Sequence, residues 1–178
     1  MDKKGPFGLW MGMSLEQVGP GIEVIGRCQF RVKSVPMAHS AFDWYILQIT
    51  PNCGLSWIRA CGKTIQTSVY GIELKSAFEA MESKLAAAYG KYEKIDILLP
   101  ESIWNKPGEW MQGIVLRERI LMAEWPPKNG ASLKEPLTSI LLATEAIDTT
   151  SGYLVVDYFF QNFPAATAEM AAEEDGAL

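Results

Sequence analysis

The chain has 178 residues, of which 48% are hydrophobic and 21% charged, and its formal net charge is −5. This composition is typical of a globular protein and excludes a disordered chain. Part of the negative charge lies near the C-terminus, at Glu169, Glu173, Glu174 and Asp175. The remaining chain is therefore close to neutral, which excludes the basic surface expected for binding nucleic acid or an anionic membrane.

The first predicted elements are a short helix and three strands. Ser14 and Gln17 have the spacing of a capping box, which predicts a helix that begins there and ends at Gly19. Strand-like segments follow at about 27–33, 42–50 and 55–61. The turn residues of 51–54 separate the last two segments, so these two should form an antiparallel hairpin.

A longer helix follows, and its apolar residues recur at alternating spacings of four and three. These residues are Leu74, Phe78, Met81, Leu85 and Ala88. They share one face of a helix that Gly90 ends. Further strands are predicted at about 95–99, 119–125, 138–147 and 153–161, and the ambiguous segment 108–116 favours a helix.

The order of these elements predicts the fold class. Hairpins dominate over crossovers, which favours an α+β fold with a mainly antiparallel sheet of six to seven strands and two or three helices packed on one face. We expect one domain over residues 1–164, followed by a flexible acidic tail over 165–178.

Several features favour a soluble, cytoplasmic protein. The first residues show no signal-peptide pattern, and no uncharged apolar run approaches the roughly 18 residues of a membrane span. Cys28, Cys53 and Cys61 cannot all pair, which favours reduced thiols, although a bridge between Cys53 and Cys61 is an alternative.

The sequence contains no recognised catalytic, cofactor or metal motif, so we expect a protein that is not an enzyme and binds no cofactor or metal. The single histidine, His39, could formally complete a nucleophilic set with Cys28 and Asp43, but no supporting motif surrounds it. The segment Gly62-Lys63-Thr64 matches the end of a phosphate-binding loop, yet Trp57 occupies the position of that loop's first glycine.

Aromatic and charged residues alternate with apolar residues along the predicted strands. One face of the sheet should pack on the helices, while the other mixes Tyr, Trp, Arg and Asp, a composition that interface hot spots favour. An ordinary solvated sheet face would also fit this pattern. The predicted partner-binding residues are Tyr45, Trp57, Arg59, Tyr153 and Asp157.

The segment Leu9-Trp10-Met11-Gly12-Met13-Ser14-Leu15-Glu16-Gln17-Val18 resembles the helix entry of small bacterial protein-binding domains. These include assembly lipoproteins of the SmpA/OmlA type and the β-lactamase inhibitor protein. The resemblance implies helices on an antiparallel sheet and a function through binding other proteins. The first residues show no lipoprotein leader and no lipid-attachment cysteine, so we expect no envelope role of the lipoprotein kind. The expected compact cytosolic body, the lack of a catalytic set and the open sheet face are together similar to the features of bacterial toxin immunity proteins.

The leading hypothesis is therefore a non-enzymatic protein-binding protein, an immunity protein or inhibitor that neutralises a toxin or enzyme by occlusion. Two alternatives stay open. One is a small-molecule-binding or catalytic domain with a pocket near His39. The other is a structural subunit of a homo-oligomer, such as a homodimer, that buries the open sheet face against itself.

Overall fold

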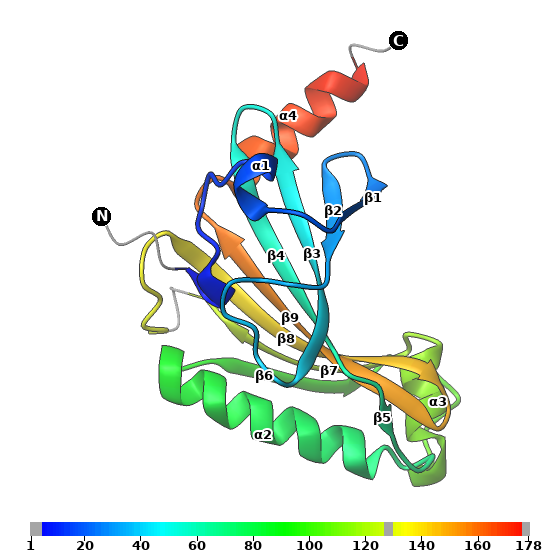
Figure 1. The fold of residues 1–178 in the computed structure, drawn as a ribbon. Coiled ribbons are helices and arrows are strands. Elements are labelled where there is room, and N and C mark those ends of the chain that lie inside the picture. The colour runs from blue at the N-terminus through cyan, green and yellow to red at the C-terminus, as the bar shows by residue number, and fades with distance from the viewer. Residues whose placement is uncertain (1–4, 127–129, 176–178) are drawn as a thin grey trace. The chain divides into compact units, whose positions relative to one another are not determined.

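The computed structural model describes residues 5–126 and 130–175 (Figure 1). Its strands are β1 (Ile22–Gly26), β2 (Gln29–Val32), β3 (Phe42–Thr50), β4 (Gly54–Gly62), β5 (Ile65–Gln66), β6 (Glu93–Leu98), β7 (Arg119–Trp125), β8 (Leu137–Asp148) and β9 (Ser151–Phe160). The α-helices are α1 (Leu15–Val18), α2 (Ile72–Tyr89), α3 (Trp110–Val115) and α4 (Phe163–Asp175). Two 3₁₀ turns, η1 (Pro6–Gly8) and η2 (Pro107–Glu109), complete the described elements.

The strands pair in the order β1-β2-β3-β4-β9-β8-β7-β6, and β5 pairs with β9, which makes a nine-stranded sheet. The pairings β1–β2, β2–β3, β5–β9, β6–β7 and β7–β8 are all antiparallel. The α+β class with an antiparallel sheet is therefore confirmed. The predicted number of six to seven strands is too small.

Two strands that the sequence analysis missed account for the difference. Strand β1 is a short, largely exposed edge strand between two glycines, and its residues show no apolar alternation. Strand β5 has two residues, too few for a periodic signal. The predicted helix at Ser14 is confirmed as α1, and the Ser14 N–H donates to the side-chain oxygen of Gln17 at 2.9 Å.

The chain divides into two compact units, and the single domain expected over residues 1–164 stays a prediction. Unit 1 comprises Met1–Cys61, Lys134–Thr138 and Asp157–Leu178, and unit 2 comprises Gly62–Leu133 and Ser139–Val156. Each unit has its own buried apolar residues, so we describe each by itself.

In unit 1, the N-terminal segment packs on the hairpin of β3 and β4. The backbone N–H of Gly12 donates to the Leu55 carbonyl (2.8 Å), and the Leu55 N–H donates to Met13 (2.9 Å). Gly54 has a φ of +65°, and a Cβ there would collide with the Gly12 backbone. Glycine is therefore required at the position where the hairpin meets the N-terminal segment.

In unit 2, helix α2 buries four of the five residues of the predicted apolar stripe, and the fifth, Ala88, is exposed. Leu74, Phe78, Met81 and Leu85 are buried, and the N–H of Gly90 caps the helix by donating to Ala86. None of the helices among the described residues combines the length and apolar character needed to cross a membrane.

The predicted flexible tail over 165–178 overlaps helix α4, and its last three residues lie outside the described residues. Helix α4 belongs to unit 1, where the Ala166 side chain is fully buried. The alanine-rich sequence of this segment favours a helix, and the burial of Ala166 shows that α4 packs within its unit.

Candidate functional site

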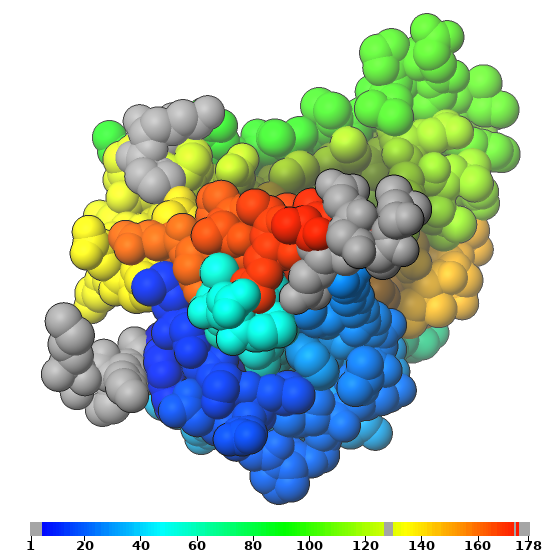
Figure 2. Space-filling model, turned by 90° about the horizontal axis from the view of Figure 1, so that it is seen from above, coloured from blue at the N-terminus to red at the C-terminus, as the bar shows by residue number. Residues whose placement is uncertain are grey.

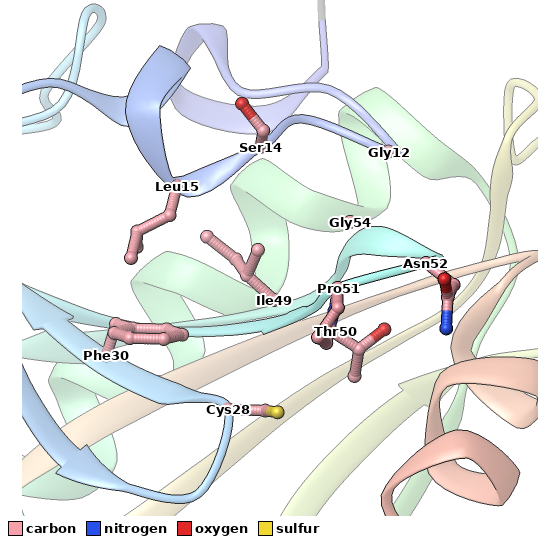
Figure 3. A pocket seen from close by; sticks show the side chains of 10 residues that line it. All are labelled: Gly12, Ser14, Leu15, Cys28, Phe30, Ile49, Thr50, Pro51, Asn52 and Gly54. Atoms are coloured by element: carbon pink, nitrogen blue, oxygen red, sulfur yellow. The ribbon is translucent and has the colours of Figure 1, made fainter.

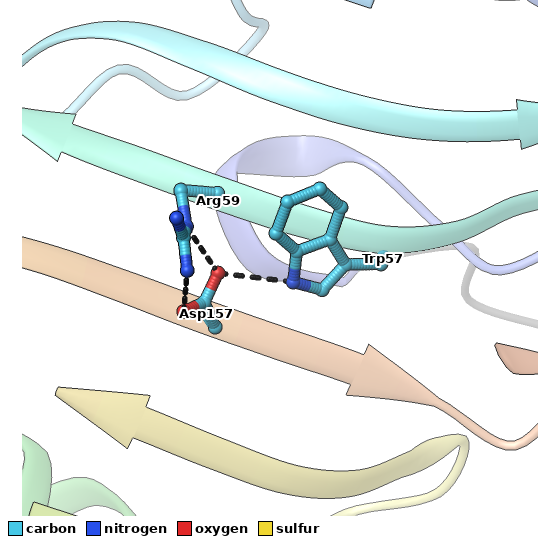
Figure 4. A network of polar contacts seen from close by, with 3 residues as sticks. All are labelled: Trp57, Arg59 and Asp157. Atoms are coloured by element: carbon cyan, nitrogen blue, oxygen red, sulfur yellow. Dashed lines mark hydrogen bonds and ion pairs between the residues drawn. The ribbon is translucent and has the colours of Figure 1, made fainter. Parts of the chain in front are cut away.

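A buried carboxylate organises two half-exposed side chains in unit 1 (Figure 4). Asp157 on β9 is fully buried. It accepts hydrogen bonds from Nε and Nη2 of Arg59, at 2.8 and 2.9 Å, and from Nε1 of Trp57, at 3.0 Å. The guanidinium and carboxylate thus form a two-bond fork, a geometry that fixes the plane of the arginine.

The strands bring these three residues together for simple geometric reasons. Trp57 and Arg59 are two positions apart on β4, so both side chains point to the same face of the sheet. Strand β9 lies next to β4, and Asp157 on it lies opposite this pair. The guanidinium carbon of Arg59 also lies 5.3 Å from the centre of the Trp57 ring, within the range of a cation–π contact.

Aromatic rings extend this arrangement toward α4. The Phe159 ring centre lies 6.5 Å from that of Trp57, and Phe163 packs edge-on against Phe159 at 5.0 Å. All three rings are half-buried. We call Trp57, Arg59, Asp157, Phe159 and Phe163 the Arg59 cluster.

The structure places the predicted partner-binding residues in different environments. Trp57, Arg59 and Asp157 belong to the Arg59 cluster, where the Arg59 side chain is 34% exposed and that of Asp157 is 1% exposed. Tyr45 is only 1% exposed and packs against the rings of Phe7 and Phe42. This burial raises the pKa of the Tyr45 hydroxyl. Tyr153 is half-buried in the part of β9 that belongs to unit 2.

Phe159 and Phe163 were missed as candidate site residues. Alternation from Asp157 along β9 places Phe159 on the same face, so this signal was available in the sequence. Phe163 begins α4, and nothing local in the sequence predicts that its ring packs back onto β9.

A second candidate site is a cavity of about 310 Å³ in unit 1 (Figure 3). Its lining comes from the N-terminal segment, α1, the β1–β2 turn, β2, the end of β3, the β3–β4 turn and the start of β4. The lining residues are Gly12, Ser14, Leu15, Cys28, Phe30, Ile49, Thr50, Pro51, Asn52 and Gly54. The volume lies at the lower end of the range for small-molecule sites.

The structure does not bring Cys28 together with His39. The carbonyl of Cys28 accepts a hydrogen bond from Ile49, near the end of β3, while the carbonyl of His39 accepts one from Phe42, where β3 begins. Seven residues of strand between these contacts span about 23 Å. Asp43 is exposed beside Phe42, and the lining of the cavity includes neither Asp43 nor His39. Within the described residues, therefore, Cys28 and His39 do not form a catalytic pair.

Cys28, Cys53 and Cys61 form no disulfide in the structure. Within residues 5–126 and 130–175, no group of three or more His, Cys, Asp or Glu side chains is arranged to hold a metal ion. Comparisons of the chain with protein-family models, with curated proteins and with solved structures find no match. The resemblance to bacterial protein-binding domains therefore stays a prediction from the N-terminal segment.

Proposed function

We propose that this protein works by binding another protein through the Arg59 cluster. The observation that carries the proposal is the fully buried Asp157, which holds Arg59 in a fork and also accepts the Trp57 indole N–H. Tryptophan and arginine are the residues in which binding energy concentrates at protein interfaces. Because both side chains are already fixed, little conformational entropy would be lost when a partner binds.

The ion pair itself supports a role in recognition. Replacing a buried ion pair by apolar residues is often neutral or stabilising for a fold, so the fold gains little from this one. The pair does place a guanidinium next to three half-exposed aromatic rings. Since Asp157 balances the charge of Arg59, we expect a partner surface with apolar side chains and hydrogen-bond acceptors and without a strong net charge.

The finer proposal is an immunity protein or inhibitor that occludes a toxin or enzyme. A preformed, rigid binding surface suits tight, stoichiometric inhibition. The captured partner should then be an enzyme or toxin whose activity falls in proportion to the amount of this protein added. If light scattering shows an oligomer at the working concentration, the alternative function, a structural subunit of a homo-oligomer, would be favoured instead.

The test replaces the ion pair without leaving a charge unpaired. The double variant Arg59→Met/Asp157→Leu should fold with about wild-type stability. The wild-type protein and the double variant are each immobilised and exposed to the native cell extract. The double variant should capture less of the partner than the wild type does, by a factor of about ten or more, because truncating a hot spot costs about 2 kcal/mol or more of binding free energy.

Two substitutions in unit 2 serve as matched controls. Trp104→Ala removes a half-buried indole, and Arg117→Ala removes an exposed guanidinium. Both should capture the partner as the wild-type protein does. Equal capture by the wild type and the double variant would contradict the proposal.

The cavity next to α1 favours a second function, small-molecule binding. It is lined by Leu15, Phe30 and Ile49, with Thr50 and Asn52 as polar neighbours. If this site is functional, ligands found by NMR screening should be lost in Leu15→Trp, which fills the cavity. They should be kept in His39→Ala, because His39 does not line it. If ligand binding were instead lost in His39→Ala and kept in Leu15→Trp, the binding site would lie at the loop before β3.

A further inference from the structure

Glu169 of α4 is held by the β3–β4 turn through both carboxylate oxygens. One oxygen accepts from the Thr50 hydroxyl (2.6 Å) and from the Cys53 N–H (3.3 Å). The other accepts from the Asn52 N–H and from its side-chain amide, both at 2.9 Å. Figure 2 shows α4 lying directly against this turn.

A second tie holds the beginning of the helix. The side-chain amide of Asn162 donates to the carbonyls of Cys53 (2.8 Å) and Leu55 (3.1 Å). This tie is uncharged, whereas Glu169 contributes a carboxylate. Helix α4 is therefore attached to the same hairpin at two places, and one of them depends on a negative charge.

The position of α4 affects two other features: the Arg59 cluster, at the start of the helix, and the Cys53 thiol, in the β3–β4 turn. Phe163, at the start of the helix, supplies the last ring of the Arg59 cluster by packing on Phe159. At the turn, Glu169 lies next to the thiol of Cys53. Burial, together with the hydrogen bond and charge of Glu169, raises the pKa of that thiol, which lowers its reactivity at neutral pH.

We propose that Glu169 is a latch: its carboxylate holds α4 on the β3–β4 turn, and its release exposes the turn and makes the Cys53 thiol reactive. The four donors converge on one carboxylate, as expected for a site that binds the charged form. The latch acts within this chain, so it does not depend on the proposed protein partner.

The direction of its pH dependence follows from the same contacts. The Thr50 hydroxyl, with further hydrogen bonds from Asn52 and Cys53, lowers the pKa of Glu169 below its ordinary value of 4.5. The titratable group that faces it from the turn is the Cys53 thiol, which is neutral at acidic pH. The latch is therefore closed above the ordinary glutamate pKa of 4.5 and opens as the pH falls through the lowered pKa of Glu169.

The test measures the isolated protein. Glu169→Gln removes the charge at nearly constant shape, and Glu174→Gln, an exposed position on the same helix, is the matched control. Alkylation by iodoacetamide at pH 7.5, followed for each cysteine by peptide mass spectrometry, should be about three- to tenfold faster at Cys53 in Glu169→Gln. The rate at Cys28, which lies in the β1–β2 turn, should stay unchanged.

Amide hydrogen exchange provides the second measurement. The N–H groups of Asn52 and Cys53 donate to Glu169, so both should exchange about tenfold faster in Glu169→Gln than in Glu174→Gln. Equal alkylation and equal exchange in the two variants would overturn the latch. Because no partner is present, such a result would leave the proposed protein-binding function to its own test.

Discussion

Arg59→Ala is expected to lower the free energy of unfolding by about 2–4 kcal/mol. Removing one member of a buried ion pair costs about 3–5 kcal/mol, and we lower that range because the Arg59 side chain is one-third exposed. The substitution removes two of the hydrogen bonds that the buried Asp157 carboxylate accepts. Urea unfolding followed by circular dichroism measures the change.

The double variant Arg59→Met/Asp157→Leu separates the cost of an unpaired charge from the value of the pair. We expect it to be within about 1 kcal/mol of the wild type, because apolar residues of similar size replace buried ion pairs at little cost. If the single and double variants were equally unstable, the guanidinium and the carboxylate would be needed for the fold. Such a result would contradict the proposal that the ion pair serves recognition.

Phe78→Ala is expected to have a large effect in unit 2, lowering the free energy of unfolding by about 3–5 kcal/mol. Phe78 is fully buried at the centre of the α2 stripe, and the Lys94 ammonium lies 5.2 Å from its ring centre. Truncation therefore leaves a cavity and removes the ring beneath this lysine. The midpoint of thermal unfolding should fall by about 6–20 °C.

A matched substitution on the same helix gives the reference for this result. Glu79→Ala changes an exposed neighbour of Phe78, and its effect should stay within about 0.5 kcal/mol. A loss below about 1.5 kcal/mol for Phe78→Ala would show that α2 contributes little to the core of its unit.

Periodic patterns predicted most elements of this fold. The stripe of α2, the hairpin of β3 and β4 and the strands after Gly90 appear in the structure within a few residues of their expected bounds. Short elements were the difficulty, because β1 and β5 lack enough residues for a pattern. The acidic residues near the C-terminus predict a solvated tail, but the same segment is rich in alanine and forms helix α4.

The candidate site was harder to predict than the fold. Alternation placed Trp57 and Arg59 on one face, but their bonds to Asp157 join residues about one hundred positions apart. No local signal reports which strands become neighbours. For Tyr45, alternation along β3 predicted the open face of the sheet, whereas the structure buries its side chain against Phe7.

Oxidative footprinting of the partner complex tests the proposed binding surface most directly. Hydroxyl radicals modify exposed aromatic side chains, and peptide mass spectrometry compares the free protein with the complex. The account predicts that oxidation of Trp57, Phe159 and Phe163 falls several-fold on binding, while that of Trp104 in unit 2 stays constant. Unchanged oxidation of Trp57 and Phe159, with protection elsewhere on the chain, would contradict it.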